Sequence, residues 1–173
     1  MDRRLFLASG LALAACSATP KSPKGPVLPL TLDQAFVGRK TGAGAFRIWL
    51  TGETRSFTAR LHGSLSQDGT RLTVVEDFDY DDGQKNRLTW VFDRTGPNGW
   101  TGRRDDTVGM ATVTEQNGEI RLAYTADFKS LSGATRLGFQ DVIYRTATGL
   151  VVNDAVVTRA GIPVGSVRFE IQG

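Results

Sequence analysis

Apolar and polar residues alternate along most of the chain from residue 43 onward. Every second residue is mainly apolar in residues 46–50, 57–61, 72–80, 88–92, 120–128, 137–143 and 167–171. A period of two is typical of β-strands that bury one face, because successive side chains point to opposite sides of a sheet. Only residues 32–37 have the pattern of a short helical turn. The chain is therefore predicted to be all-β.

Turn signals separate the alternating runs. The strongest are Asp68-Gly69, Asp82-Gly83 and Asn117-Gly118, because Asp-Gly and Asn-Gly favour tight hairpin loops. Further turns are expected at residues 95–99, 132–133, 148–149 and 160–161. Consecutive hairpins predict that each strand pairs with the next one along the chain.

A sandwich and a barrel both accommodate such strands. A sandwich requires long Greek-key crossovers, and no loop of sufficient length is evident. Hairpin connections favour closure, which also removes exposed sheet edges. We therefore expect residues 31–173 to form one domain, a single antiparallel up-and-down β-barrel of about 8–10 strands.

The N-terminus resembles an export signal. Arg3 and Arg4 precede an apolar run at residues 5–15, which is too short to span a bilayer as a helix. The sequence Leu13-Ala14-Ala15-Cys16 is similar to a bacterial lipobox, in which the cysteine is lipidated after cleavage. Residues 1–15 are thus predicted to be a lipoprotein signal peptide, and Cys16 the lipidation site. The adjacent arginines also fit a twin-arginine signal, so the export route stays open.

Four prolines spaced by three residues follow the predicted cleavage site, at positions 20, 23, 26 and 29. This spacing favours an extended polyproline conformation. Residues 16–30 are therefore expected to be a linker between the membrane and the barrel. The predicted location is the envelope of a Gram-negative bacterium, lipid-anchored to the outer membrane and facing the periplasm.

Composition narrows the chemistry. The chain has one cysteine and one histidine, which excludes an internal disulfide and a Cys/His zinc site. Its 21 basic and 18 acidic residues leave a formal net charge of +3, and the basic residues are scattered. This distribution argues against nucleic-acid binding. We expect no metal and no cofactor.

Two acidic residues interrupt apolar faces and form the centre of a candidate site. Glu76 shares its face with Leu72 and Val74, and Asp141 lies between Phe139 and Ile143. A buried carboxylate requires a partner, protonation or contact with water. The candidate pocket or structural polar cluster consists of Glu76, Arg87, Trp90, Trp100, Arg103, Arg104, Asp105 and Asp141. Either these residues fix a ligand's polar group, or they form a structural ion pair near one end of the barrel.

Other motifs give weaker signals. The acidic segment at residues 76–83 lacks the spacing of an EF-hand loop and is interpreted as a hairpin. His62 shares a face with polar residues and is expected to be exposed, and no nucleophile-elbow motif occurs. Acid–base catalysis by Glu76 and Asp141 remains an alternative, although no motif supports it. The chain is therefore expected not to be an enzyme.

Several motifs together resemble the bacterial lipoprotein family catalogued as domain of unknown function 3833. The resemblance extends from the lipobox to Phe169 and rests on Glu76-Asp77-Phe78-x-Tyr80-Asp81-Asp82-Gly83, Arg87-x-x-Trp90, Gly102-Arg103-x-Asp105-Asp106-x-Val108-Gly109 and Gly161-x-x-Val164-Gly165. It implies a lipocalin-like, or calycin-like, barrel. The family has no established activity, so the resemblance assigns no catalytic residue.

Two functions follow as hypotheses. The first is a membrane-anchored lipoprotein whose barrel binds or carries a small apolar or lipid-like ligand. The alternative is a non-enzymatic adaptor in an envelope lipid pathway, with the acidic edge at residues 77–82 contacting a protein partner whose identity the sequence does not specify.

Overall fold

The computed structural model describes residues 19–130 and 133–173. A short helix, α1 (Leu32–Phe36), precedes the main sheet. The strands, in chain order, are β1 (Val27–Leu28), β2 (Gly38–Ile48), β3 (Thr54–Leu65), β4 (Arg71–Tyr80), β5 (Lys85–Gly96), β6 (Gly99–Arg103), β7 (Ala111–Gln116), β8 (Glu119–Ser130), β9 (Gly133–Thr146), β10 (Val151–Arg159) and β11 (Ile162–Gln172).

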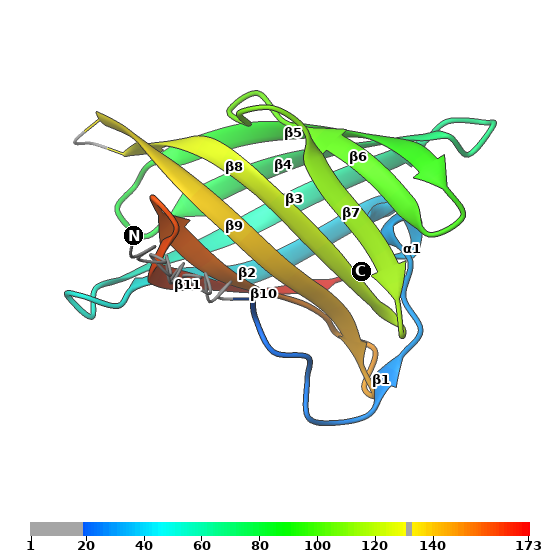
Figure 1. Cartoon of the computed structure of the whole chain (residues 1–173), viewed down its shortest axis with the longest axis horizontal. Coiled ribbons are helices and arrows are strands. Elements are labelled where there is room, and N and C mark those ends of the chain that lie inside the picture. The colour runs from blue at the N-terminus through cyan, green and yellow to red at the C-terminus, as the bar shows by residue number, and fades with distance from the viewer. Residues whose placement is uncertain (1–18, 131–132) are drawn as a thin grey trace, which may run out of the picture.

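Strands β2 to β11 form a closed antiparallel barrel in which each strand pairs with its neighbour in sequence (Figure 1). Pairing of β11 with β2 closes the barrel, with Gly165 opposite Ile48 and Gln172 opposite Thr41. The predicted up-and-down barrel is therefore confirmed. In the described residues it has ten strands, and β1 is an additional strand on its outside.

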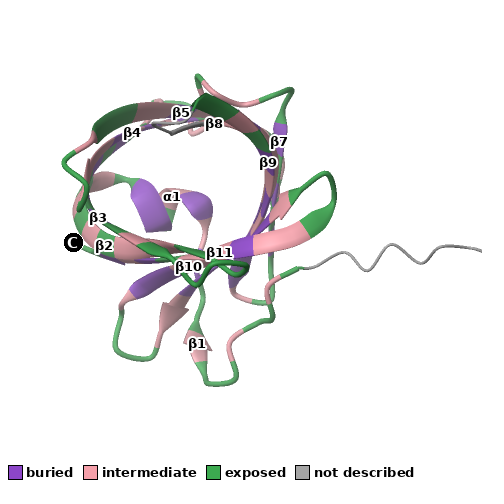
Figure 2. Cartoon of the chain, turned by 90° about the vertical axis from the view of Figure 1, so that its left-hand side faces the viewer, coloured by how far each residue is buried: buried purple, intermediate pink, exposed green. Residues whose placement is uncertain are grey.

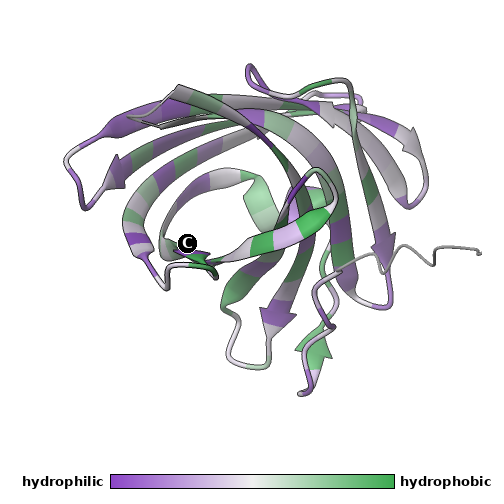
Figure 3. Ribbon diagram, turned by 60° about the vertical axis from the view of Figure 1, so that its left-hand side comes forward, coloured by the Kyte–Doolittle hydropathy of each residue, from purple (hydrophilic) through white to green (hydrophobic). Residues whose placement is uncertain are grey.

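In the described residues the tight turns occur where the sequence predicts them, and residue 132 of the turn expected at 132–133 lies outside this part of the chain. Gly69, Gly83 and Gly149 have positive φ, as do both residues of the Asn117-Gly118 loop. Glycine and asparagine adopt this backbone region at low cost, so these positions fix the hairpins and their register. The resulting alternation of apolar and polar positions along the strands is visible in Figure 3.

Helix α1 closes one end of the barrel, as the view along the barrel in Figure 2 shows. Leu32 and Phe36 of this helix are buried in the main core. Gly63 of β3 permits the close approach, because a Cβ atom there would lie 2.0 Å from the Phe36 carbonyl oxygen. The opposite end, called here the open end, carries the β2–β3, β4–β5 and β10–β11 turns.

A buried carboxylate holds the closed end together. Glu115 of β7 accepts hydrogen bonds from the Leu32 backbone N–H at 2.8 Å and from the Trp100 indole N–H at 3.0 Å. Two donors that would otherwise be buried without partners are thereby satisfied. Glu115 thus ties α1 to β6 and β7.

The N-terminal segment lies along the outside of the barrel. Val27 and Leu28 pair with Thr146 and Arg145 of β9, and Arg121 donates a hydrogen bond to the Pro20 carbonyl oxygen at 3.2 Å. An apolar cluster on the outer face of β9 and β10 explains this position: Val142, Tyr144 and Val152 are buried, with Val27 and Leu150 against them. The linker expected at residues 16–30 is therefore attached to the barrel at Pro20 and at Val27–Leu28, while residues 24–26 between these points are exposed.

Candidate functional site

The barrel encloses a cavity of about 530 Å³. Toward the open end, aromatic side chains from five strands line it: Phe46, Phe57, Phe78, Phe128 and Phe169. Polar side chains line its middle, and Phe36 of α1 lies at its closed end. A cavity of this volume falls within the range of small-molecule sites, about 300–1,000 Å³.

The phenyl rings pack against one another rather than filling the space. Phe57 contacts Phe78 edge to face, with ring centres 5.4 Å apart, and contacts Phe169 at 5.3 Å. Phe46 stacks on Phe128 at 6.0 Å, joining β2 to β8 across the barrel. This part of the cavity offers an apolar surface made of rigid rings.

Glu76 points into the cavity from the middle of β4. Its side chain is buried, and burial raises the pKa of its carboxyl group to about 7. Arg104 opposes this shift, whereas the nearby charge of Asp106 adds to it. A carboxyl group with a pKa near 7 changes between its neutral and its ionised form near neutral pH.

Asp141 enters the same cavity from β9. Burial raises the pKa of its carboxyl group to about 7 as well, while a hydrogen bond from Asn153 and the charge of Arg104 act in the opposite direction. The Asn153 Nδ2 donates to Asp141 Oδ2 at 3.3 Å. Within the described residues, Asp141 Oδ1 and Asn153 Oδ1 are buried without a hydrogen-bond partner.

Arg104 supplies the positive charge of the cluster. Its Nε and Nη2 donate to Asp106 Oδ1 and Oδ2 at 2.6 and 3.0 Å. The guanidinium carbon lies 4.9 Å from the Trp90 ring centre and 5.3 Å from that of Tyr124. Burial disfavours its charge, but Tyr124, Asp106 and Glu76 outweigh this effect, so the pKa of Arg104 lies above its usual value.

The loop between β6 and β7 brings Arg104 into the wall. Strands β6 and β7 are short, so residues 104–110 cover the space beside β8. Val108 N–H donates to Thr125 O at 2.8 Å and Asp127 N–H to Asp106 O at 2.9 Å, which fixes the loop on β8.

The first half of β5 pairs only with β4 among the described residues, and Asn86 and Leu88 border the cavity there. The cavity thus reaches the side of the barrel between β5 and this loop.

The structure separates the predicted site residues into two groups. Glu76, Trp90, Arg104 and Asp141 line the cavity together, and the exposed Asp105 lies at its edge. The remaining three predicted residues lie elsewhere and are described next. Each hypothesis about the polar residues therefore has a structural counterpart. The two acids that face the cavity correspond to a ligand site, and the Arg104–Asp106 pair corresponds to a structural ion pair.

Arg87, Trp100 and Arg103 do not join the inner cluster. Arg87 borders the cavity, but its guanidinium group pairs with Asp77 on the outer surface. Trp100 is buried at the closed end against Glu115, and Arg103 is exposed. For Arg87 and Arg103 strand direction gives the reason, because their neighbours Leu88 and Gly102 take the inward positions.

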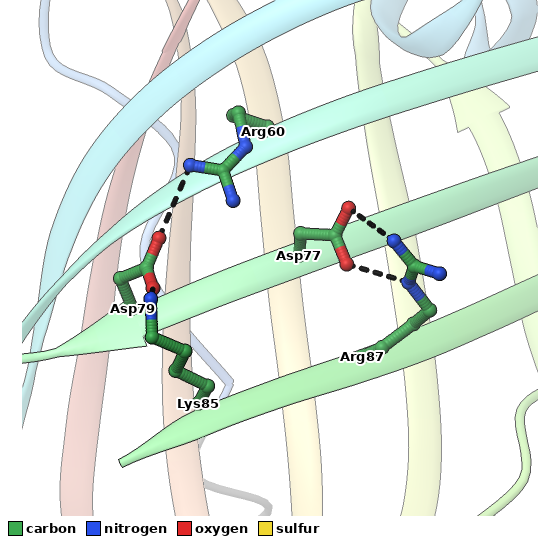
Figure 4. A network of polar contacts seen from close by, with 5 residues as sticks. All are labelled: Arg60, Asp77, Asp79, Lys85 and Arg87. Carbon is green, nitrogen blue, oxygen red and sulfur yellow. Dashed lines mark hydrogen bonds and ion pairs between the residues drawn. The ribbon is translucent and has the colours of Figure 1, made fainter. Parts of the chain in front are cut away.

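The acidic segment at residues 76–83 forms ion pairs outside the barrel, apart from Glu76. Asp77 pairs with Arg87, and Asp79 pairs with both Arg60 and Lys85 (Figure 4). His62 is exposed on β3, as predicted. No group of three or more potential metal ligands occurs in the residues that the structure describes.

Three polar residues of the site are not among the eight residues of the predicted cluster. Asp106 and Tyr124 contact Arg104, and Asn153 contacts Asp141. The alternation of the sequence could have identified Asn153 and Tyr124, because each lies two residues from buried, inward-facing residues of its strand. Asp106 lies in a loop, where no periodicity applies.

Cys16, the predicted lipidation site, lies outside the described residues, as do residues 1–15 of the predicted signal peptide. Within the described part of the chain, no helix is long and apolar enough to span a bilayer.

Comparisons with known proteins agree with this architecture. The structure of the S-type phycobiliprotein lyase CPES from Guillardia theta is similar, with a TM-score of 0.57 and 10% identity over 78% of this chain and 85% of that chain. This likeness confirms the lipocalin-like fold. A search of curated proteins gave no match. The family described as "Protein of unknown function (DUF3833)" matches residues 10–172. Because the match covers nearly the whole sequence, the chain belongs to the DUF3833 family.

Proposed function

We propose that this protein binds a small, largely apolar ligand inside its barrel and that it does so without catalysis. The observation that carries the proposal is the 530 Å³ cavity, which is lined by phenyl rings toward the open end. Barrels of about eight to ten strands either fill their interior with side chains or hold one small ligand. Here the rings of Phe46, Phe57 and Phe169 leave space between them instead of closing it.

A fluorescence titration tests ligand binding. Nile red is a neutral, apolar probe whose emission rises on leaving water, and the full-length chain is expected to bind it with one-to-one stoichiometry. Val167 lines the cavity on β11, so Val167→Trp is expected to fill the space and weaken binding at least about tenfold. Val156→Trp is the matched control, since Val156 alternates with the buried, inward-facing Ala155 and Val157 on β10. Equal binding by both variants would refute an internal site.

Membrane attachment is a separate proposal. The lipobox at residues 13–16 supports lipidation of Cys16 and a location in the bacterial envelope, facing the periplasm. Arg121 holds the Pro20 carbonyl group against the barrel. An anchor at Cys16 would then lie within roughly 15 Å of the point where the chain joins the barrel wall.

The alternative function, a protein adaptor, has less support. It depends on the acidic edge at residues 77–82, where Asp77, Asp79 and Asp82 each pair with a basic side chain of the barrel itself. A paired carboxylate attracts a basic partner less strongly, because the two charges largely cancel.

A further inference from the structure

Two hydrogen-bond acceptors inside the barrel have no donor. Asp141 Oδ1 on β9 and Asn153 Oδ1 on β10 are buried and lack partners within the described residues. Both residues line the cavity, and only 5% of Asp141 is exposed. Buried acceptors of this kind are costly unless a donor reaches them. Their position in an open cavity indicates that a ligand can supply that donor.

The charges around these acceptors are also unbalanced. Glu76, Asp106 and Asp141 face the cavity, and Arg104 is matched by Asp106 in a two-bond ion pair. The other two arginines that border the cavity are committed elsewhere. Arg55 pairs with Asp82 and Arg87 with Asp77. The charge of Arg104 therefore acts on Glu76, Asp106 and Asp141 together, and in the described part of the chain no second basic side chain that lines the cavity balances the other two acids.

We propose that Glu76, Asp141 and Asn153 form a subsite for the protonated amine of an amphipathic ligand, whose hydrocarbon part lies among the phenylalanines. This inference rests on the proposed function and specifies the ligand's chemical class. An ammonium group offers several N–H donors and one positive charge, which matches both the free acceptors and the unpaired carboxyl groups. A carboxylate ligand would bring a further negative charge, and an alcohol would bring one donor and no charge.

The subsite should depend on pH. Glu76 faces Arg104, Asp106, Trp90, Tyr80 and Tyr124, while Asp141 faces Asn153, Arg104, Glu76 and Tyr124. Burial raises the pKa of both carboxyl groups to about 7, so their ionisation increases between pH 6 and pH 8. Decylamine remains protonated at both pH values. Its affinity should therefore rise over this interval, whereas that of decan-1-ol should stay constant.

Calorimetric titration of the full-length chain with decylamine, decan-1-ol and decanoic acid tests the inference. At pH 8 we expect decylamine to bind at least about tenfold more tightly than the alcohol, because a hydrogen bond to a charged group is stronger than a neutral one. Asp141→Asn should remove this preference, and Glu76→Gln should reduce it. Asp77→Asn is the control, since Asp77 follows Glu76 but faces the outer surface. Neither amide substitution adds volume, and each removes a buried charge, so both variants are expected to fold.

The outcomes separate the two proposals. If the alcohol or the acid binds as tightly as the amine, or if Asp141→Asn keeps the preference, the amine subsite is refuted while the binding cavity stands. If Nile red binds but no ten-carbon probe does, the subsite is likewise refuted. If neither Nile red nor any of these probes binds, the proposed function itself fails.

Discussion

Arg104 and Asp106 form a two-bond ion pair within the barrel wall, at 2.6 and 3.0 Å. Only 9% and 13% of their side chains are exposed. The pair connects the β6–β7 loop to the polar middle of the cavity, where Arg104 lies over Trp90 and Tyr124. It thus fixes a segment of the wall that regular strand pairing does not provide.

Replacing Arg104 by methionine should destabilise the protein by about 3 kcal/mol, because Asp106 would remain buried without its partner and near two other acids. Arg136→Met is the matched control: Arg136 also pairs with an aspartate, Asp127, but 64% of its side chain is exposed. That substitution should cost less than about 1 kcal/mol. Urea unfolding measures both values, and similar costs for the two variants would show that the Arg104 pair is not buried in solution.

Stability should fall as the pH rises from about 5 to 8. The folded-state pKa values of Glu76 and Asp141 are about 7, whereas the ordinary values of these side chains are 4.5 and 3.8. The folded state therefore holds more protons in this range, and raising the pH past the folded pKa removes the associated stability. Each group should contribute about 2 kcal/mol to the decrease.

Urea midpoints at pH 5 and pH 8 measure this effect. Glu76→Gln and Asp141→Asn should each flatten the dependence and stabilise the protein at pH 8, since an amide carries no charge at either pH. A wild-type stability that stays level or increases over this interval would contradict the burial of the two acids.

The closed end should depend on Glu115. Glu115→Ala leaves the Leu32 N–H and the Trp100 indole N–H without an acceptor, and we expect a loss of about 2–4 kcal/mol. The exposed neighbour Gln116 provides a control, because Gln116→Ala should change the free energy of unfolding by less than about 0.5 kcal/mol. Near-ultraviolet circular dichroism would report any loosening around Trp100. A loss for Glu115→Ala as small as that of the control would argue against this role.

Lipidation is predicted at a single residue. Cells that express the wild-type chain should incorporate labelled palmitate into it, and Cys16→Ala should remove the label because Cys16 is the chain's one cysteine. Cell fractionation should then show the variant released from the membrane. Continued labelling of the variant would refute the lipobox interpretation.

The sequence was sufficient to predict the barrel and the two acids that point into it. Every second residue from Leu72 to Tyr80 and from Leu137 to Ile143 is apolar except Glu76 and Asp141, so the parity of the two strands places these acids inside. Trp100 is also inward, but it packs against Glu115 beyond the cavity. Parity gives the face of a strand, and it does not give the position along the barrel axis at which a cavity ends.

Other features depend on contacts that no local pattern encodes. Arg104 and Asp106 lie in a loop, so their pairing depends on how residues 104–110 dock on β8. The packed N-terminal segment follows from the outer face of β9 and β10, where Val142 and Val152 are fully buried. The continuous apolar run at residues 142–144 is the signal that both faces of this sheet are covered.

The central claim is that the barrel holds a small, largely apolar ligand. Native mass spectrometry tests it most directly, on the Cys16→Ala chain, which is expected to carry no lipid anchor and can be purified without detergent. We predict a non-covalent small-molecule adduct on this protein that is lost when Val167→Trp is added and kept when Val156→Trp is added. A Cys16→Ala protein that shows only the mass of the chain itself, and that also fails to bind Nile red, would contradict the claim.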